Sequence, residues 1–106
     1  MEFKIVWSPN AIKCVHAIGI DLVKRDSVIN ANKIVNAIVE RVNKLVVFPE
    51  IGRMVPEFKQ TEIKEVLVKK KRIIYEIKGS DINILAVAPE RMALVNIDAD
   101  WIWPDL

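Results

Sequence analysis

The residues of this chain that could do chemistry are mainly cations, and they gather in its second half. Residues 59–79 hold seven lysines and arginines against three acidic residues, whereas residues 80–106 hold five acidic residues and a single cation, Arg91. Within the basic stretch, Lys69, Lys70, Lys71 and Arg72 are consecutive. Such a run indicates a surface that contacts anions such as nucleic acid phosphates. The alternative is a solvated hairpin tip whose charges deter edge-to-edge aggregation.

Other reactive side chains are isolated from one another. Histidine can transfer protons near neutral pH, but no second catalytic group accompanies His16, so we expect a histidine at the edge of the core. Cys14, the one cysteine, lies among apolar residues, which predicts a small buried side chain and no internal disulfide. Tyr75 alternates with apolar neighbours and is expected to be a core aromatic. A single histidine and a single cysteine exclude a structural zinc site, and no cofactor is expected.

Length and composition predict one domain over residues 1–106, with an atypical tail at 91–106. The chain has 106 residues, is 52% apolar and carries a net charge of +2. A small domain with so many apolar residues is expected either to have a dense core or to present apolar surface to a partner. No apolar run approaches the roughly 20 residues that span a bilayer, and no signal-peptide core opens the chain. We therefore expect a cytoplasmic protein without a membrane partner.

The first half of the chain predicts a strand and two helices. Residues 2–7 alternate between apolar and polar, as a strand does. Ser8-Pro9 then marks the start of a helix that runs to about Lys24. Asp26 or Ser27 caps a second helix, whose apolar stripe reaches Leu45 and which Pro49 ends. Two antiparallel helices joined by so short a bend form a helical hairpin.

The second half predicts a three-stranded antiparallel meander over residues 63–68, 72–78 and 82–88. Together with the first half, this order predicts an α+β fold in which the helical hairpin packs on one face of the sheet. For residues 92–97 a short helix and an added strand both remain open. The acidic end of the tail contains Trp101 and Trp103, which either bind a partner or fold back on the domain.

Three segments, in their order and spacing, resemble the RelE/ParE superfamily, the toxin halves of bacterial and archaeal toxin–antitoxin pairs. They are the opening strand into Trp7–Pro9, the segment Phe48–Arg53, and Ile63–Glu65 followed by Arg72–Tyr75. The resemblance covers residues 3–88. It implies a type II toxin of the plasmid-stabilisation kind, which inhibits growth and is silenced by a small antitoxin that wraps its working surface. The partner expected at Trp101 and Trp103 is then this antitoxin or a second copy of the chain.

The superfamily has two branches that act on different targets. RelE-like members resemble ribonucleases that cut messenger RNA on the ribosome, and ParE-like members poison DNA gyrase. RNA cleavage needs proton transfers and cations that stabilise an anionic phosphorane. The resemblance implies Arg72 as the arginine of the third strand and Lys64 as a basic residue of the strand before it. After the last strand, however, residues 88–91 read Ala-Pro-Glu-Arg in place of the family's glycine and basic run, which argues against efficient cleavage.

The resemblance is closer to the ParE-like branch, so gyrase is the expected target. The expected target-binding residues are Lys64, Lys69, Lys70, Lys71, Arg72 and Arg91. The alternative is a ribosome-dependent mRNA endoribonuclease with Lys64, Arg72 and Arg91 as catalytic candidates. A third reading is an inactive relative that serves only to bind protein. The target-binding interpretation requires Lys64 and Arg72 to lie on the same side of the strands and in contact with solvent.

Overall fold

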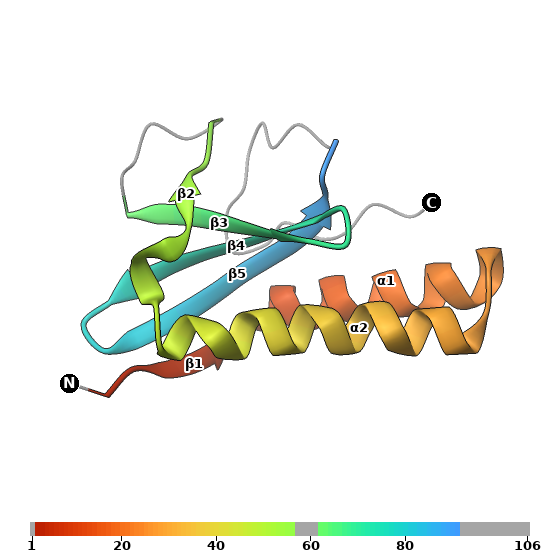
Figure 1. Ribbon diagram of the computed structural model, residues 1–106, viewed down its shortest axis with the longest axis horizontal. Coiled ribbons are helices and arrows are strands. Elements are labelled where there is room, and N and C mark those ends of the chain that lie inside the picture. Colours follow the sequence, from red (N-terminus) through yellow and green to blue (C-terminus); the bar gives the residue numbers. More distant parts are fainter. Residues whose placement is uncertain (1, 57–61, 92–106) are drawn as a thin grey trace.

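One mixed sheet of five strands organises the computed structural model, which describes residues 2–56 and 62–91 (Figure 1). The strands are β1 (Lys4–Trp7), β2 (Arg53–Met54), β3 (Ile63–Val68), β4 (Lys71–Lys78) and β5 (Asp81–Pro89), in the order β1-β5-β4-β3-β2. The strands β2 to β5 pair antiparallel, and β1 pairs parallel to β5. The α+β fold and the meander predicted from sequence are confirmed. The sequence does not predict β2, because two residues are too few to show a period.

Two helices follow β1 and run antiparallel, side by side, along one side of the sheet (Figure 1). They are α1 (Pro9–Arg25) and α2 (Val28–Asn43). The hydroxyl of Ser8 accepts a hydrogen bond from the Ala11 amide at 2.9 Å, and Ser27 caps α2 in the same way through the Asn30 amide at 3.0 Å. Each cap satisfies an amide that the first turn of a helix leaves unpaired.

The second helix ends earlier than the sequence predicts. Regular α-helix stops at Asn43, and the 3-10 turn η1 (Lys44–Val46) continues the chain. Pro49 begins a second 3-10 turn, η2 (Pro49–Ile51), rather than ending α2. A proline disfavours helical backbone in the residue before it, and Phe48 accordingly takes a non-helical ψ of 71°. The tighter turns carry the chain from the helix to the edge of the sheet.

A bulge in β5 ties the start of α1 to the sheet. Ile74 pairs with Ala86, but Tyr75 pairs with Ile84, so Leu85 is an extra residue in its strand. The carbonyl of Leu85 accepts hydrogen bonds from the Ser8 hydroxyl at 3.2 Å and from the Asn10 side-chain amide at 3.0 Å. A bulge leaves such a backbone group unpaired in the sheet, and here the first turn of α1 uses it.

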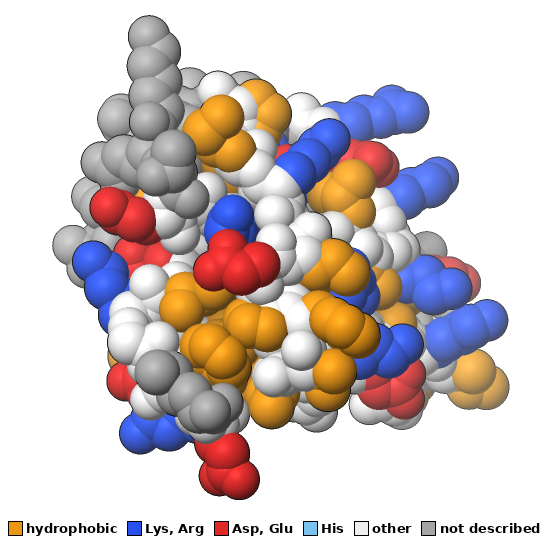
Figure 2. All heavy atoms as spheres, turned by 60° about the vertical axis from the view of Figure 1, so that its left-hand side comes forward, with side chains coloured by type: hydrophobic (Ala, Val, Ile, Leu, Met, Phe, Trp, Pro, Cys, Tyr) orange, Lys and Arg blue, Asp and Glu red, His pale blue; other side chains and the backbone are white. Residues whose placement is uncertain are grey.

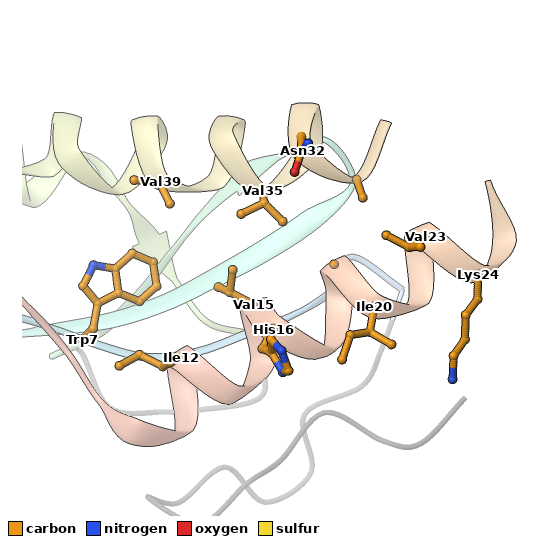
Figure 3. Close-up of a pocket in the computed structure, with 12 residues that line it drawn as sticks. Trp7, Ile12, Val15, His16, Ile20, Val23, Lys24, Asn32, Val35 and Val39 are labelled. Atoms are coloured by element: carbon orange, nitrogen blue, oxygen red, sulfur yellow. The ribbon is translucent and has the colours of Figure 1, made fainter. Parts of the chain in front are cut away.

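The register assigns each strand residue to one face of the sheet, because residues directly opposite each other share a face. Trp7 and Tyr75 both pair with Ile84, and Trp7 points between the helices (Figure 3), so these residues mark the face that the helices cover. The core lies there: each of the side chains of Ile18, Ile38, Leu45, Ile73, Tyr75 and Ile84 is at most 1% exposed. Cys14 is also buried, as predicted.

Candidate functional site

The turn between β3 and β4 consists of two lysines, both exposed. Lys69 and Lys70 have φ angles of 48° and 62°, and a positive φ at both positions of a two-residue turn is the signature of a type I′ turn. Asn-Gly or Asp-Gly usually occupies such a turn, because glycine takes a positive φ without steric cost and Asn and Asp tolerate it better than other side chains. A lysine there is strained by on the order of 1–3 kcal/mol. The turn places two strained cations at the end of the sheet nearest the α1–α2 connection (Figure 1).

Neighbouring segments hold this turn in place. The Glu90 amide donates a hydrogen bond to the Lys70 carbonyl at 2.9 Å, and Lys71 pairs with Pro89 across the two strands. The exposed Arg91 directly follows Glu90, so its backbone lies beside the turn. The structure therefore brings together Lys69, Lys70, Lys71 and Arg91, four of the cations that the sequence analysis proposes. We call these four residues the turn cluster.

Lys71 lies between the turn and the end of α1 and is half-buried. Its burial, followed by the nearby Arg25 guanidinium, lowers the pKa of its ammonium group, while the Asp21 carboxylate opposes this shift. Arg25 and Asp21 form an ion pair of 2.6 Å with each other. Because the two charges of this pair balance, the turn cluster keeps its excess of positive charge.

Arg72, the next residue, has a different environment. Its side chain is 5% exposed, and its Nε atom donates to the Glu65 carboxylate at 2.6 Å. The other oxygen of the same carboxylate accepts from the Arg53 Nε atom at 2.8 Å. Glu65 itself is 0% exposed and joins β2, β3 and β4 through its two arginines. Arg72 was expected to contact a target at the surface, but its side chain has little access to solvent and binds an internal carboxylate.

Lys64 lies on the opposite face of the sheet from Arg72. It pairs directly with Tyr75, whereas Arg72 lies three residues earlier in β4 and pairs with Leu67. Lys64 is therefore on the helix-covered face, where its ammonium group lies 3.5 Å from the Glu50 carboxylate. The expectation that Lys64 and Arg72 share one face is wrong, and these two residues do not form the common target-binding surface that the sequence analysis requires. Strand alternation decides this, because an odd offset between paired positions reverses the direction of a side chain.

Tyr75 has a structural role that its hydroxyl makes visible. The hydroxyl donates to the Pro49 carbonyl at 2.8 Å and accepts from the Gly52 amide at 2.9 Å. Burial raises the pKa of this hydroxyl, against the effect of the hydrogen bond from Gly52. A Cβ atom at Gly52 would lie 2.4 Å from the same oxygen, so glycine is required there. Tyr75 thus fixes η2 to the sheet as a core aromatic, as the sequence predicts.

An apolar groove runs between α1 and α2, with a volume of about 760 Å³. Figure 3 shows Val35 and Val39 of α2 facing Ile12, Val15 and Ile20 of α1 across it, with Trp7 at one end. Ile12 is 56% exposed, although Ile12, Val15 and Ile18 recur in the sequence at the spacing of an apolar helix stripe. Gly19 leaves part of the groove open, and the exposed His16 lies along its rim. A periodic stripe alone does not distinguish a buried helix face from one that is left uncovered.

Exposed apolar side chains also continue past α2. Val47, Phe48, Ile51 and Met54 are each more than half exposed. Figure 2 shows apolar side chains gathered just below the middle of the view, with lysine and arginine side chains beside them and along the right-hand side of the molecule. The domain therefore has exposed apolar surface as well as a dense core, and surface of this kind is typical of protein contacts.

The remaining expectations are limited by what the structure describes. Trp101 and Trp103 lie outside the described residues, as do residues 92–97. Within residues 2–56 and 62–91, no group of three His, Cys, Asp or Glu side chains could hold a metal ion. No helix among these residues is long and apolar enough to span a membrane.

The fold, with its helical hairpin on a meander, is that of a small toxin from a toxin–antitoxin pair. The family described as ParE toxin of type II toxin-antitoxin system, parDE, matches residues 5–94, and the chain belongs to this family. Among solved structures, the chromosomal ParDE system of P. aeruginosa matches with a TM-score of 0.71 and 23% identity, over 83% of this chain and 96% of that one. The toxin–antitoxin complex RelBE2 of Mycobacterium tuberculosis matches with a TM-score of 0.61 and 17% identity, over 84% and 99%. None of the curated protein sequences compared with this chain matches it.

Proposed function

We propose that this member of the ParE toxin family inhibits growth by acting on DNA gyrase and is silenced by a cognate antitoxin. The match to the ParE family supports gyrase as the target, since the ParE-like branch of the superfamily poisons gyrase. The separation of Lys64 from Arg72 argues against the alternative, cleavage of messenger RNA. The two residues lie on opposite faces of the sheet, and each contacts a glutamate. A ribonuclease of this kind needs its cations gathered around one phosphate, where they stabilise the charge that develops during cleavage. Two cations on opposite faces do not meet this need.

Expression of the full chain tests the choice of target. We expect growth arrest with intact transcripts and a DNA-damage response, and inhibition of gyrase supercoiling by the purified chain. Rapid loss of translated messages, with cuts within codons, would instead assign the chain to the ribosome-dependent endoribonucleases. Good expression without any arrest would make it an inactive relative that only binds protein.

The antitoxin partner is the second part of the proposal, and the α1–α2 groove is the surface that supports it. An amphipathic helix presents apolar side chains at positions i, i+3 or i+4, and i+7, and such a row can lie in a groove between two helices. Exposed apolar side chains such as Ile12 and Val39 are costly in water and become buried when such a helix binds. We therefore place the apolar face of an antitoxin helix in this groove.

A charge placed in the groove tests this assignment. Val39→Asp should weaken the complex with the protein encoded by the neighbouring reading frame at least about tenfold, because the complex would bury an unpaired carboxylate. The matched control is Asn36→Asp, which adds the same charge to an exposed residue of α2 outside the groove. If co-expression of the neighbouring protein relieves the toxicity of both variants equally well, the antitoxin binds elsewhere.

A further inference from the structure

We propose that the turn cluster binds the phosphate backbone of double-stranded DNA. Lys69 and Lys70 would make the principal contacts, and Lys71 and Arg91 would support them. The inference deepens the proposed function and rests on it for its setting, since gyrase acts on duplex DNA. It makes the toxin a contact of both the enzyme and the DNA that the enzyme holds.

The choice of residues at the turn is the first observation. The turn that joins β4 to β5 has Gly79 at a φ of 61°, a conformation that glycine adopts without steric cost. The turn that joins β3 to β4 requires the same kind of backbone at two consecutive positions and has lysine at both. Residues held in an unfavourable backbone conformation are often found at functional sites. Lysine fits this turn less well than glycine, but it adds a positive charge that glycine lacks.

The way the turn presents its charges is the second observation. The bond from the Glu90 amide to the Lys70 carbonyl holds the base of the turn, so the two exposed lysines extend from a supported backbone. Residues 69–71 and 90–91 together carry four cations and one carboxylate, that of Glu90. The neighbouring Arg25–Asp21 pair adds no net charge. These five residues therefore bring a net charge of +3 to one end of the sheet.

The density of charge along duplex DNA favours it over an acidic protein as the ligand of this surface. Duplex DNA presents a phosphate charge about every 1.7 Å along its axis, a density that closely spaced lysines can use. Lysine is a point charge without the planar fork that reads a base edge, so binding should be independent of sequence and sensitive to salt.

The test measures binding of the purified full chain to a fluorescent 20-base-pair duplex over a range of salt concentrations. The double variant Lys69→Asn/Lys70→Gly removes two cations while installing the residues that a type I′ turn prefers. We expect it to weaken binding about tenfold or more at low salt and to reduce the slope of log K against log salt by about 2, one for each lost phosphate contact. Since the variant suits the turn better, unfolding would not explain a loss of binding.

The matched control is Lys33→Gln/Lys44→Gln, which removes the same charge from exposed positions on and just after α2. The control should bind duplex DNA like the parent chain. Equal weakening in both double variants would overturn the proposal, because net charge alone would then explain the binding. Tighter binding to single-stranded RNA, or equally effective competition by poly-glutamate, would also overturn the assignment to duplex DNA.

Separate measurements distinguish this inference from the proposed function. If the double variant still binds DNA like the parent chain while the parent inhibits gyrase, the inference fails and the proposed function stands. If the parent chain does not inhibit gyrase and its expression leaves growth unaffected, the proposed function fails, whatever the DNA binding shows.

Discussion

Arg72 and the two lysines of the β3–β4 turn are neighbours in sequence but differ in their exposure to solvent. Lys69 and Lys70 are exposed on a strained backbone, whereas Arg72 is 5% exposed and donates to a buried glutamate. The sequence alone presents them as a single basic run. The difference shows that the contacts of a cation in a strand depend on the face of the sheet to which it points. The exposure of a cation in a turn depends on the conformation of the turn. The following variants test this contrast between the internal arginine and the turn lysines.

The largest effect is expected at the internal side of the comparison. Glu65→Ala removes the carboxylate that accepts hydrogen bonds from both Arg53 and Arg72. Removing one partner of a buried ion pair typically costs about 3 kcal/mol or more, because the remaining charge loses its compensation. Chemical denaturation should show this loss in the free energy of unfolding.

Glu62→Ala is the matched control, since Glu62 is exposed just before β3, and it should change stability by less than about 0.5 kcal/mol. Glu65→Gln should fall between the two, because it keeps an acceptor but not the charge. Equal stabilities for Glu65→Ala and Glu62→Ala would show that Arg72 does not depend on this carboxylate.

A second prediction concerns the packing that surrounds the same glutamate. A Cβ atom at Gly52 would lie 2.4 Å from the Tyr75 hydroxyl oxygen and 2.9 Å from the Glu65 carbonyl oxygen. Gly52→Ala should therefore destabilise the fold by about 2 kcal/mol, as overpacking of a core does. Thermal unfolding measures the change.

Gly19→Ala provides the contrast, because its Cβ atom would make an ordinary contact of 3.6 Å with Val35. Alanine at a helix interior is favoured over glycine by up to about 1 kcal/mol, so this variant should be more stable than the parent chain. A Gly52→Ala chain as stable as the Gly19→Ala chain would contradict the close packing at η2.

The contrast between arginine and lysines also shows how far sequence reasoning reaches. Capping by Ser8 and Ser27 and the alternation of β3 to β5 are local signals, and they predict the α+β fold. The partners of Lys64 and Arg72 depend on register and on residues far along the chain, which no local period contains. The same holds for Ile12, whose helical stripe is visible in sequence although the groove that leaves it exposed is not. An acidic residue in a strand-like segment, Glu65, is the sequence feature that could have indicated a buried ion pair for Arg72.

A third prediction concerns the exposed side of the comparison. Lys69→Asn/Lys70→Gly should raise the free energy of unfolding by about 1 kcal/mol, because both replacements tolerate a positive φ better than lysine does. Gly79→Ala should lower it by a similar amount, since it puts a Cβ atom at a φ of 61°. If both hairpin variants changed stability in the same direction, strain at the lysine turn would not be the cause.

The smallest effect concerns Lys71, which lies between the two regions and shares features of both. Burial is the main cause that lowers its pKa, and Arg25 is the next. Arg25→Gln should therefore raise the pKa of Lys71 in an NMR titration, but leave it below the ordinary lysine value of 10.5, whereas Lys33→Gln should not change it. Because the folded chain has the lower pKa, the unfolded chain binds more protons between the two values, and the contribution of Lys71 to stability increases as pH rises through this window. The raised pKa of Tyr75 has the opposite effect, so its contribution to stability decreases as pH rises above 10.0. In a Lys71→Gln chain, the free energy of unfolding should therefore lose the increase with pH that Lys71 causes and keep the decrease that Tyr75 causes.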